Sequence, residues 1–347
     1  MASQRLNGPR ARTAWRMLLL GLAISSILLI VLARQLEGAN WSRFWSILAN
    51  LDGRVLVIPI AAWTASSLLR PWRWQMIFPK RQQPRFLSSF GALSAGNMAN
   101  NILPLRGGDV LRCFLVETGT SLTRASMALA TLGLEKLLDG FALLAILLFS
   151  FIFMSPPQWL GRLSLISAIT FGCALAGAVV LHYRTRAFLE FVRSSFRLLR
   201  IDSLGDRIAT LLEWFAQGLE AVSSPLLISE LAVLTLLIWA ADAVAIWGLA
   251  LALQVSVSIP GAAIISAIVG LSLMIPSAPG FVGTYEFFSV AAIRLLGVEF
   301  AGAMALTVLM HAWSVLCTTI IGVAGLWACG ANFSRLIHGH AEVPVGD

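Results

Sequence analysis

The sequence predicts an all-α polytopic membrane protein with about six full transmembrane helices and two re-entrant helical hairpins of opposite orientation. Composition is the first reason, because 58% of the 347 residues are hydrophobic and only 12% are charged, about half the charged share of an average soluble domain. Second, several apolar runs reach the roughly 20 residues that a helix needs to cross a bilayer. Third, two other apolar stretches are broken by glycine, proline and polar residues, which lipid tolerates only where protein or water covers them.

Six apolar runs qualify as full spans by their length. They lie at about 15–33, 54–78, 125–153, 163–183, 225–251 and 300–328. The first run is too long for the apolar core of a signal peptide, so we expect a retained helix behind a basic arm at 1–14. The predicted membrane domain is 15–330, and 331–347 form a C-terminal tail.

The positions of arginine and lysine predict the topology. These residues cluster in the N-terminal arm, just after the second span, and in residues 184–222. We therefore expect a multi-pass protein of the cell inner membrane with both termini in the cytoplasm. This topology requires residues 87–122 to enter the membrane and leave it again on the cytoplasmic side, and residues 260–297 to do so on the other side. Residues 184–222 also contain a basic amphipathic helix, which lies on an anionic membrane surface or packs on the cytoplasmic ends of the spans.

The first broken stretch is "SAGNMANNILPLRGGDVLR", residues 94–112. Its pattern predicts a helix that ends near Pro104, a turn at Gly107 and Gly108, and a new helix with Asp109 as its N-cap. Broken helices of this kind build the binding sites of many transporters.

Two arginines in this stretch are the strongest candidates for a binding role. Arg106 and Arg112 carry planar guanidinium groups, whose donors match phosphate oxygens. Charges inside a membrane are functional hypotheses by default, so we expect these arginines to hold a lipid headgroup. The alternative is that one of them pairs with Asp109 and only fixes the turn.

The second broken stretch is "MIPSAPGFVGTYEFF", residues 274–288. Two prolines should end one helix and two glycines should allow close approach of the backbone: Pro276, Pro279, Gly280 and Gly283. Glu286 falls in the first turn of the next helix, where it could stabilise the helix dipole. It could instead contact a cationic headgroup or Arg294.

Two carboxylates share one face of a predicted span, because Glu135 and Asp139 are four residues apart. Inside a membrane they require partners or water. Arg106 or Arg112 are the expected partners, with Lys136 on a neighbouring face. A proton relay or a structural pair is expected, since no nucleophile or metal set accompanies them.

Other polar residues in the spans have simpler expected roles. Arg70 and Arg73 lie in "LLRPWRW", which is typical of an interfacial belt and positive flank, although either could reach a headgroup. Asp242 and His311 are lone polar residues in spans, and we expect helix–helix hydrogen bonds from them.

Several classes of function have no support in the sequence. The net charge of +8 comes from membrane-flanking arginines, without the interleaved aromatics of a nucleic-acid groove, so no nucleic-acid partner is expected. The four cysteines are scattered and form no CxxC pair, so no metal site is expected. No nucleotide-binding or hydrolase motif is present, which leaves no expected cofactor and argues against an ATP-driven pump.

Four motifs together resemble the family of lysylphosphatidylglycerol synthase transmembrane regions, described as flippase-like membrane proteins. They are "RPWRW", "NMANNILPLRGGDVLR", "EKLLD" and "PSAPGFVGTYE", and the resemblance covers about residues 15–330. It implies a lipid-translocating domain with two re-entrant segments that meet in the bilayer. The positions that match the family are Asn101, Pro104, Arg106, Gly108, Asp109, Arg112, Glu135, Asp139, Pro279, Gly280, Gly283 and Glu286.

The resemblance leaves the lipid open. Fused relatives move aminoacylated phosphatidylglycerol, and stand-alone relatives are linked to glycolipids and hopanoids, so the expected partner is an anionic or aminoacylated phospholipid, a glycolipid or a hopanoid-type lipid. Phe281 stands where relatives often have a further glycine, which implies a more closed second tip. The soluble aminoacyl-transferring domain has no counterpart before Asp347, so we expect no enzyme.

Three functions compete. The leading one is a flippase that holds the headgroup phosphate with Arg106 and Arg112. The second is a lipid-modifying enzyme embedded in the membrane, with Glu135 or Asp139 as a base. The third is a subunit that presents lipid to a separately encoded transferase. A homo-oligomer is compatible with each of them.

Overall fold

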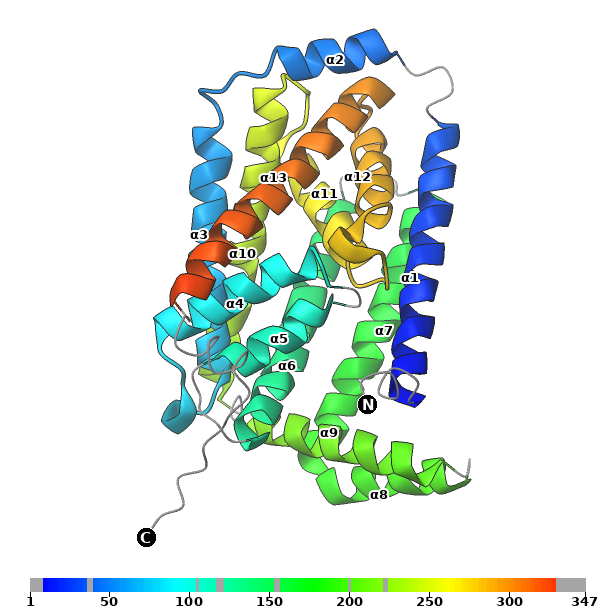
Figure 1. Ribbon diagram of the computed structural model, residues 1–347, viewed down its shortest axis with the longest axis vertical. Helices are drawn as coiled ribbons and strands as arrows, with labels where there is room; N and C mark the ends of the chain where they lie inside the picture. The colour runs from blue at the N-terminus through cyan, green and yellow to red at the C-terminus, as the bar shows by residue number, and fades with distance from the viewer. Residues whose placement is uncertain are drawn as a thin grey trace, which may run out of the picture.

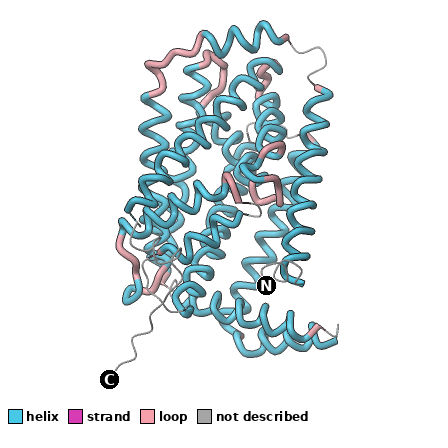
Figure 2. Tube along the Cα trace, in the orientation of Figure 1, coloured by secondary structure: helices cyan, strands magenta, loops and turns pink. Residues whose placement is uncertain are grey.

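A computed structural model describes the chain over residues 9–35, 40–103, 106–116, 122–152, 157–198, 201–220 and 224–328. Within these ranges the chain forms thirteen α-helices and two short 3₁₀ helices, and these ranges contain no strand. Figure 1 shows the order of the helices along the chain, and Figure 2 shows that short loops connect them. The predicted all-α fold is confirmed.

The longest helices coincide with the six predicted spans. They are α1 (Pro9–Arg34), α3 (Val57–Ile77), α6 (Leu122–Ser150), α7 (Gln158–Tyr183), α10 (Pro225–Ala252) and α13 (Phe300–Ala328). Three segments are both long and apolar enough to cross a membrane: Gln158–Tyr183, Pro225–Ala252 and Phe300–Trp327. The chain is therefore a helical membrane protein, while the number of full spans stays a prediction.

The first broken stretch forms two short helices, α4 (Phe86–Asn100) and α5 (Gly107–Leu115), which pack against each other. The predicted boundaries were wrong in detail. The first helix ends at Asn100, and the second begins at Gly107 with Arg106 at the N-cap position in the left-handed region, at φ 56°. Asp109 is therefore no N-cap but the third residue of α5, and its carboxylate accepts hydrogen bonds from Asn100 and Arg106. Pro104 lies outside the described residues.

The second broken stretch has the predicted form. Helix α11 (Ile259–Ser272) is followed by an irregular segment, the 3₁₀ turn η4 (Pro279–Phe281) and helix α12 (Thr284–Leu295). Gly280 and Gly283 have φ values of 65° and 89°, which explains why glycine stands at both positions. Phe281 is also left-handed, at φ 60°. The connections of the two broken pairs face each other in the centre of the molecule (Figure 1).

The remaining helices lie across the ends of the bundle. Helix α2 (Trp41–Ala49) packs on α13, and η2 (Lys80–Gln82) follows α3. Helices α8 (Thr185–Leu198) and α9 (Asp202–Glu220) form a hairpin against the ends of α6 and α7 (Figure 1). Buried Leu181 and Leu189 belong to the core of this contact. Of the two roles left open for the amphipathic segment, packing on the spans is the one observed.

Helix α11 is the centre of the largest hydrophobic core. Ile265, Ala267 and Ile268 are fully buried within it. Most of α11 is buried, because it packs against three other helices, α6, α10 and α12. This packing gives the second broken pair a rigid base, from which its tip reaches the middle of the protein.

Candidate functional site

The tips of the two broken pairs are joined by Arg106. Its Nε donates a hydrogen bond to Asp109 Oδ2 at 2.9 Å, and its Nη1 donates to the backbone oxygen of Leu273 at 3.2 Å. The guanidinium also lies 5.9 Å from the ring centre of Phe281. Arg106 thus connects the start of α5 to Leu273, directly after α11, and to Phe281 in η4. It also forms the pair with Asp109 that the alternative named.

The closed second tip also approaches the first through its backbone. A side chain at Gly280 would place its Cβ 3.3 Å from the backbone oxygen of Asn101. Asn101 is itself tied to α13, where its amide donates to the Thr318 hydroxyl at 2.9 Å. Asn101 therefore positions the tip between α13 and η4.

A buried network of charges lies below the first tip. Arg112 donates to Glu135 at 3.1 Å, and Arg73 donates to Asp139 at 2.6 Å. Arg73 also lies 3.7 Å from Glu135, so the two carboxylates share its charge. These four side chains are 1–6% exposed. The expected pairing of Glu135 with Arg112 is confirmed, whereas Asp139 pairs with Arg73 and not with Arg106 or Arg112.

The motif "LLRPWRW" is mostly an internal feature. Trp74 is fully buried and donates its ring N–H to Thr131 at 2.9 Å, and Arg73 is fully buried beside it. Trp72 is exposed, as an interfacial tryptophan would be, and so is Leu68 at the start of the motif. The belt interpretation was therefore wrong for Arg73 and Trp74, because one face of α3 turns into the charge network.

Arg70 belongs to a second ion pair on the same helix. It contacts Asp242 of α10, and its guanidinium lies 5.3 Å from the ring centre of Trp239. Trp239 donates its ring N–H to Asp139 at 3.2 Å, which links this pair to the charge network. The expected helix–helix role of Asp242 is thus confirmed, with Arg70 as its partner.

Glu286 stabilises the second tip from within. It accepts from the backbone N–H of Gly283 at 2.6 Å, which satisfies the start of α12. Its other oxygen lies 2.5 Å from Nδ1 of His311, whose Nε2 lies 3.0 Å from the backbone oxygen of Gly280. A carbonyl oxygen only accepts, so Nε2 donates there, and His311 clamps the tip to α13. Arg294 contacts Gln35 instead, so its expected pairing with Glu286 was wrong.

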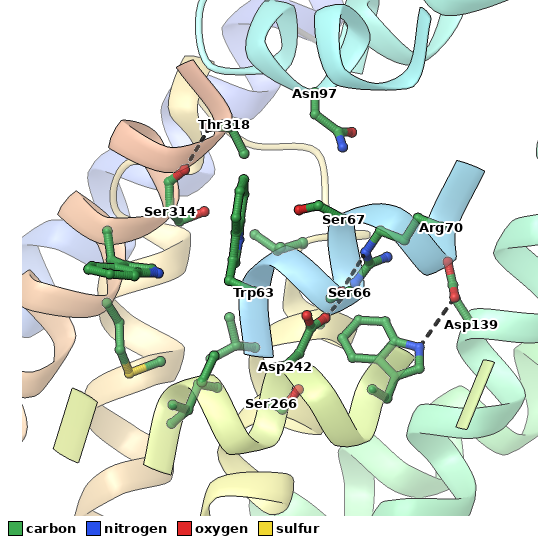
Figure 3. A pocket seen from close by; sticks show the side chains of 18 of the residues that line it. Trp63, Ser66, Ser67, Arg70, Asn97, Asp139, Asp242, Ser266, Ser314 and Thr318 are labelled. Carbon is green, nitrogen blue, oxygen red and sulfur yellow. Dashed lines mark hydrogen bonds and ion pairs between the residues drawn. The ribbon is translucent and has the colours of Figure 1, made fainter. Parts of the chain in front are cut away.

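A cavity of about 300 Å³ lies between the two tips and helices α3, α6, α10 and α13. Figure 3 shows part of its wall, with Arg70 facing Asp242 and with Ser67, Asn97 and Ser314 around Trp63. Its charged lining consists of Arg70, Arg106, Arg112, Glu135, Lys136, Asp139 and Asp242. Five of the nine predicted binding residues therefore line the same cavity. The other four contact lining residues or the tips without lining the cavity themselves: Arg73, Asp109, Asn101 and Glu286.

Lys136 is the residue whose importance the sequence analysis missed. Its Nζ lies 3.8 Å from Asp109 Oδ2, the same oxygen that binds Arg106, and 3.9 Å from Glu135 Oε1. The side chains of Arg106 and Lys136 are each 31% exposed, unlike the buried arginines behind them. The signal was available, because Lys136 is one of two lysines in the chain and lies in mid-span.

No metal centre is present in the described parts of the chain, where no group of three or more His, Cys, Asp or Glu could hold an ion. Cys113, Cys173 and Cys317 are free and far apart in the sequence. The side chains that line the cavity include guanidinium, ammonium, carboxylate, hydroxyl, amide and indole groups.

The fold and this cavity define a helical membrane protein with a charged space inside its bundle. The family model described as the lysylphosphatidylglycerol synthase TM region matches residues 18–322, and the chain belongs to this family. No solved structure matches the chain.

A curated relative adds a correction. The chain is 24% identical over 354 residues to a protein of Haloferax volcanii named Glycosyltransferase AglD. The match covers 92% of this chain and 56% of the relative, so the chain spans about half the length of that protein. The expectation of no enzyme, which rested on the missing soluble domain, is contradicted, because a relative that shares most of this chain bears an enzyme's name.

Proposed function

We propose that the protein moves a polar lipid across the membrane and that the lipid headgroup passes through the central cavity. One observation carries the proposal: Arg106 and Lys136, two partly exposed cations bound to the same aspartate oxygen, open into a cavity inside a bundle of apolar helices. Water-filled or ligand-filled spaces are where membrane proteins place such charges. Membership of a lipid-related family supports the same reading.

The proposal assigns the headgroup phosphate to Arg106 and Lys136, with Arg112 behind them. Arg106 has one guanidinium nitrogen, Nη2, that makes no hydrogen bond to the described residues, and Lys136 has ammonium donors at salt-bridge distance only. Both groups form charge-assisted hydrogen bonds to phosphate. The buried Arg112–Glu135 pair fixes the floor of the cavity.

The proposal includes a role for the two tips. The pairs α4–α5 and α11–α12 are re-entrant segments from opposite sides of a bacterial inner membrane, with six full spans around them and both termini in the cytoplasm. An arriving phosphate competes with the Leu273 carbonyl for Arg106, because an anion is the stronger acceptor. Binding then loosens the contact between the tips, and their alternate opening moves the headgroup.

A second candidate is an enzymatic activity on a membrane lipid, alone or with a separately encoded transferase. The name of the Haloferax volcanii relative favours it. Lipid mass spectrometry of cells with and without the chain tests this candidate. A lipid species that depends on the chain and persists when transport is abolished would favour the enzyme.

Replacing Arg106 by glutamine is expected to lower lipid translocation about tenfold or more. The change removes a charge-assisted hydrogen bond, a loss of about 1.5–3 kcal/mol, while the glutamine amide, which ends near the position of the arginine Nε, can still donate to Asp109. The measurement is the rate at which purified protein moves labelled phosphatidylglycerol between the leaflets of liposomes.

Arg43→Gln is the matched control. Arg43 lies on α2, outside the cavity, and forms an exposed ion pair with Glu299. It should retain the wild-type rate. Background rates from a folded wild-type protein with every lipid tested would contradict transport by the isolated chain. A wild-type rate for Arg106→Gln would contradict the phosphate site.

A further inference from the structure

Part of the cavity wall, next to the arginines, is polar but uncharged. Ser67 of α3, Asn97 of α4 and Ser314 of α13 project around Trp63 (Figure 3). Within the described ranges, no hydrogen bond from these three side chains to another protein group is present. The ring N–H of Trp313, another lining residue, is buried without an acceptor. This wall therefore offers neutral donors and acceptors that the protein leaves unused.

The carboxylates of the site are not available in the same way. Four carboxylates lie among the arginines and each has one as its partner: Asp109 with Arg106, Glu135 with Arg112, Asp139 with Arg73 and Asp242 with Arg70. Glu286, behind the second tip, is held by His311 and the Gly283 N–H. Lys136 is the fifth cation of the group, so four carboxylates face five cations and one positive charge is left over. A cationic headgroup would have to displace an arginine and would add a second uncompensated charge.

These two observations select a ligand by its chemistry. The surplus positive charge matches one anion, and a phosphate diester carries one negative charge. The unused neutral groups match hydroxyls, which both donate and accept. Trp63 and Trp313 add flat apolar surface, against which the C–H groups of a ring or a short polyol can pack.

We propose that the cavity takes a headgroup made of one phosphate and a neutral, hydroxyl-rich group such as glycerol, inositol or a sugar, and that it disfavours an aminoacylated headgroup. The inference rests on the proposed lipid transport and narrows its substrate class. Leaving buried polar groups unpaired is costly, so a headgroup without hydroxyls binds less well than one that satisfies Ser67, Asn97 and Ser314.

Competitive binding to the purified full-length chain tests the inference without requiring transport. A fluorescent phosphatidylglycerol is bound first and then displaced by short-chain lipids with identical acyl chains. The competitors are phosphatidylglycerol, phosphatidylinositol, phosphatidic acid and lysylphosphatidylglycerol. We expect the glycerol and inositol lipids to displace the probe at concentrations at least tenfold lower than lysylphosphatidylglycerol. Equal or better displacement by lysylphosphatidylglycerol would overturn the inference.

Two small substitutions test the hydroxyl wall directly. Ser67→Ala and Asn97→Ala remove unused polar groups without a change of charge and without breaking a hydrogen bond in the protein. Each should weaken phosphatidylinositol binding about fivefold and leave phosphatidic acid, which has no headgroup polyol, within twofold. Ser195→Ala, on an exposed part of α8, is the matched control. Equal losses for both lipids would overturn the assignment of this wall.

Glycerol phosphate without acyl chains separates a lipid from a soluble phosphate ester. Displacement by glycerol phosphate as strong as that by the lipid would show that the site serves a soluble ester, and would overturn the inference for lipids. Selective binding without movement in liposomes would contradict transport and leave the headgroup class standing. Faster movement of lysylphosphatidylglycerol than of phosphatidylglycerol would contradict the headgroup class and leave transport standing.

Discussion

Replacing Asp139 by asparagine is expected to lower the free energy of unfolding by about 3–5 kcal/mol, because it leaves a buried guanidinium without its main counter-charge. Arg73 is fully buried and donates to Asp139 at 2.6 Å. Glu135 lies 3.7 Å from Arg73 but also pairs with Arg112, so it compensates only part of the lost charge. The measurement is unfolding of the purified protein by detergent, followed by tryptophan fluorescence.

The control for this prediction is Asp206→Asn, which removes a carboxylate from an exposed pair with Arg193 at 3.8 Å. Exposed pairs contribute at most about 1 kcal/mol, so this variant should unfold like the wild type. If Asp139→Asn and Asp206→Asn had the same small effect, Arg73 would have another counter-charge or access to water. The buried charge network would then not be part of the stable core.

The second large effect is expected from Gly108→Ala. A Cβ at Gly108 would lie 1.9 Å from the backbone oxygen of Gly96 and 2.7 Å from the backbone nitrogen of Asn100. Neither backbone atom can move without separating α4 from α5. The loss should reach the upper end of the range for overpacking, about 3 kcal/mol, and lipid movement should fall with it because the first tip shifts.

Gly107→Ala is the matched control at the neighbouring position. Its Cβ would lie 3.1 Å from Cβ and 3.3 Å from Cδ1 of Leu103, and a shift of a few tenths of an ångström by this exposed residue relieves both contacts. Alanine also favours a helix more than glycine does, so the change should be within about 1 kcal/mol. Thermal unfolding in detergent measures both variants. Similar melting temperatures for the two alanine variants would contradict the close packing of α4 on α5.

The broad architecture was accessible from the sequence because it depends on local pattern. Runs of apolar residues of sufficient length predict the long helices, and clusters of glycine and proline predict the two interrupted pairs. Local pattern also predicts that Glu135 and Asp139 share a helix face. It does not predict which cation lies opposite, because Arg73 and Asp139 are 66 positions apart. Only the packing of α3 against α6 decides that pairing.

A more careful reading of the sequence would have avoided one of two errors. Arg70, Arg73 and Trp74 are three and four residues apart, which places them on one helix face, while Trp72 lies on another. That spacing indicates an internal face of α3 and not a uniform belt. The expected N-cap role of Asp109 failed because α5 begins two residues earlier, with Arg106 at the N-cap position. The Asp109 carboxylate binds Arg106 through one oxygen and Asn100 through the other, an arrangement visible only in three dimensions.

The most direct test of the central claim is to identify what occupies the cavity. A photoreactive p-benzoylphenylalanine in place of Trp63 faces the cavity, and the same group in place of Leu68 lies on the exposed side of the same helix. After irradiation in native membranes, mass spectrometry of the purified protein identifies the attached molecule. Our account predicts a phosphate-bearing lipid headgroup attached at position 63, weakened by Arg106→Gln, and only acyl chains attached at position 68. No headgroup adduct at position 63, with normal labelling at 68, would contradict it.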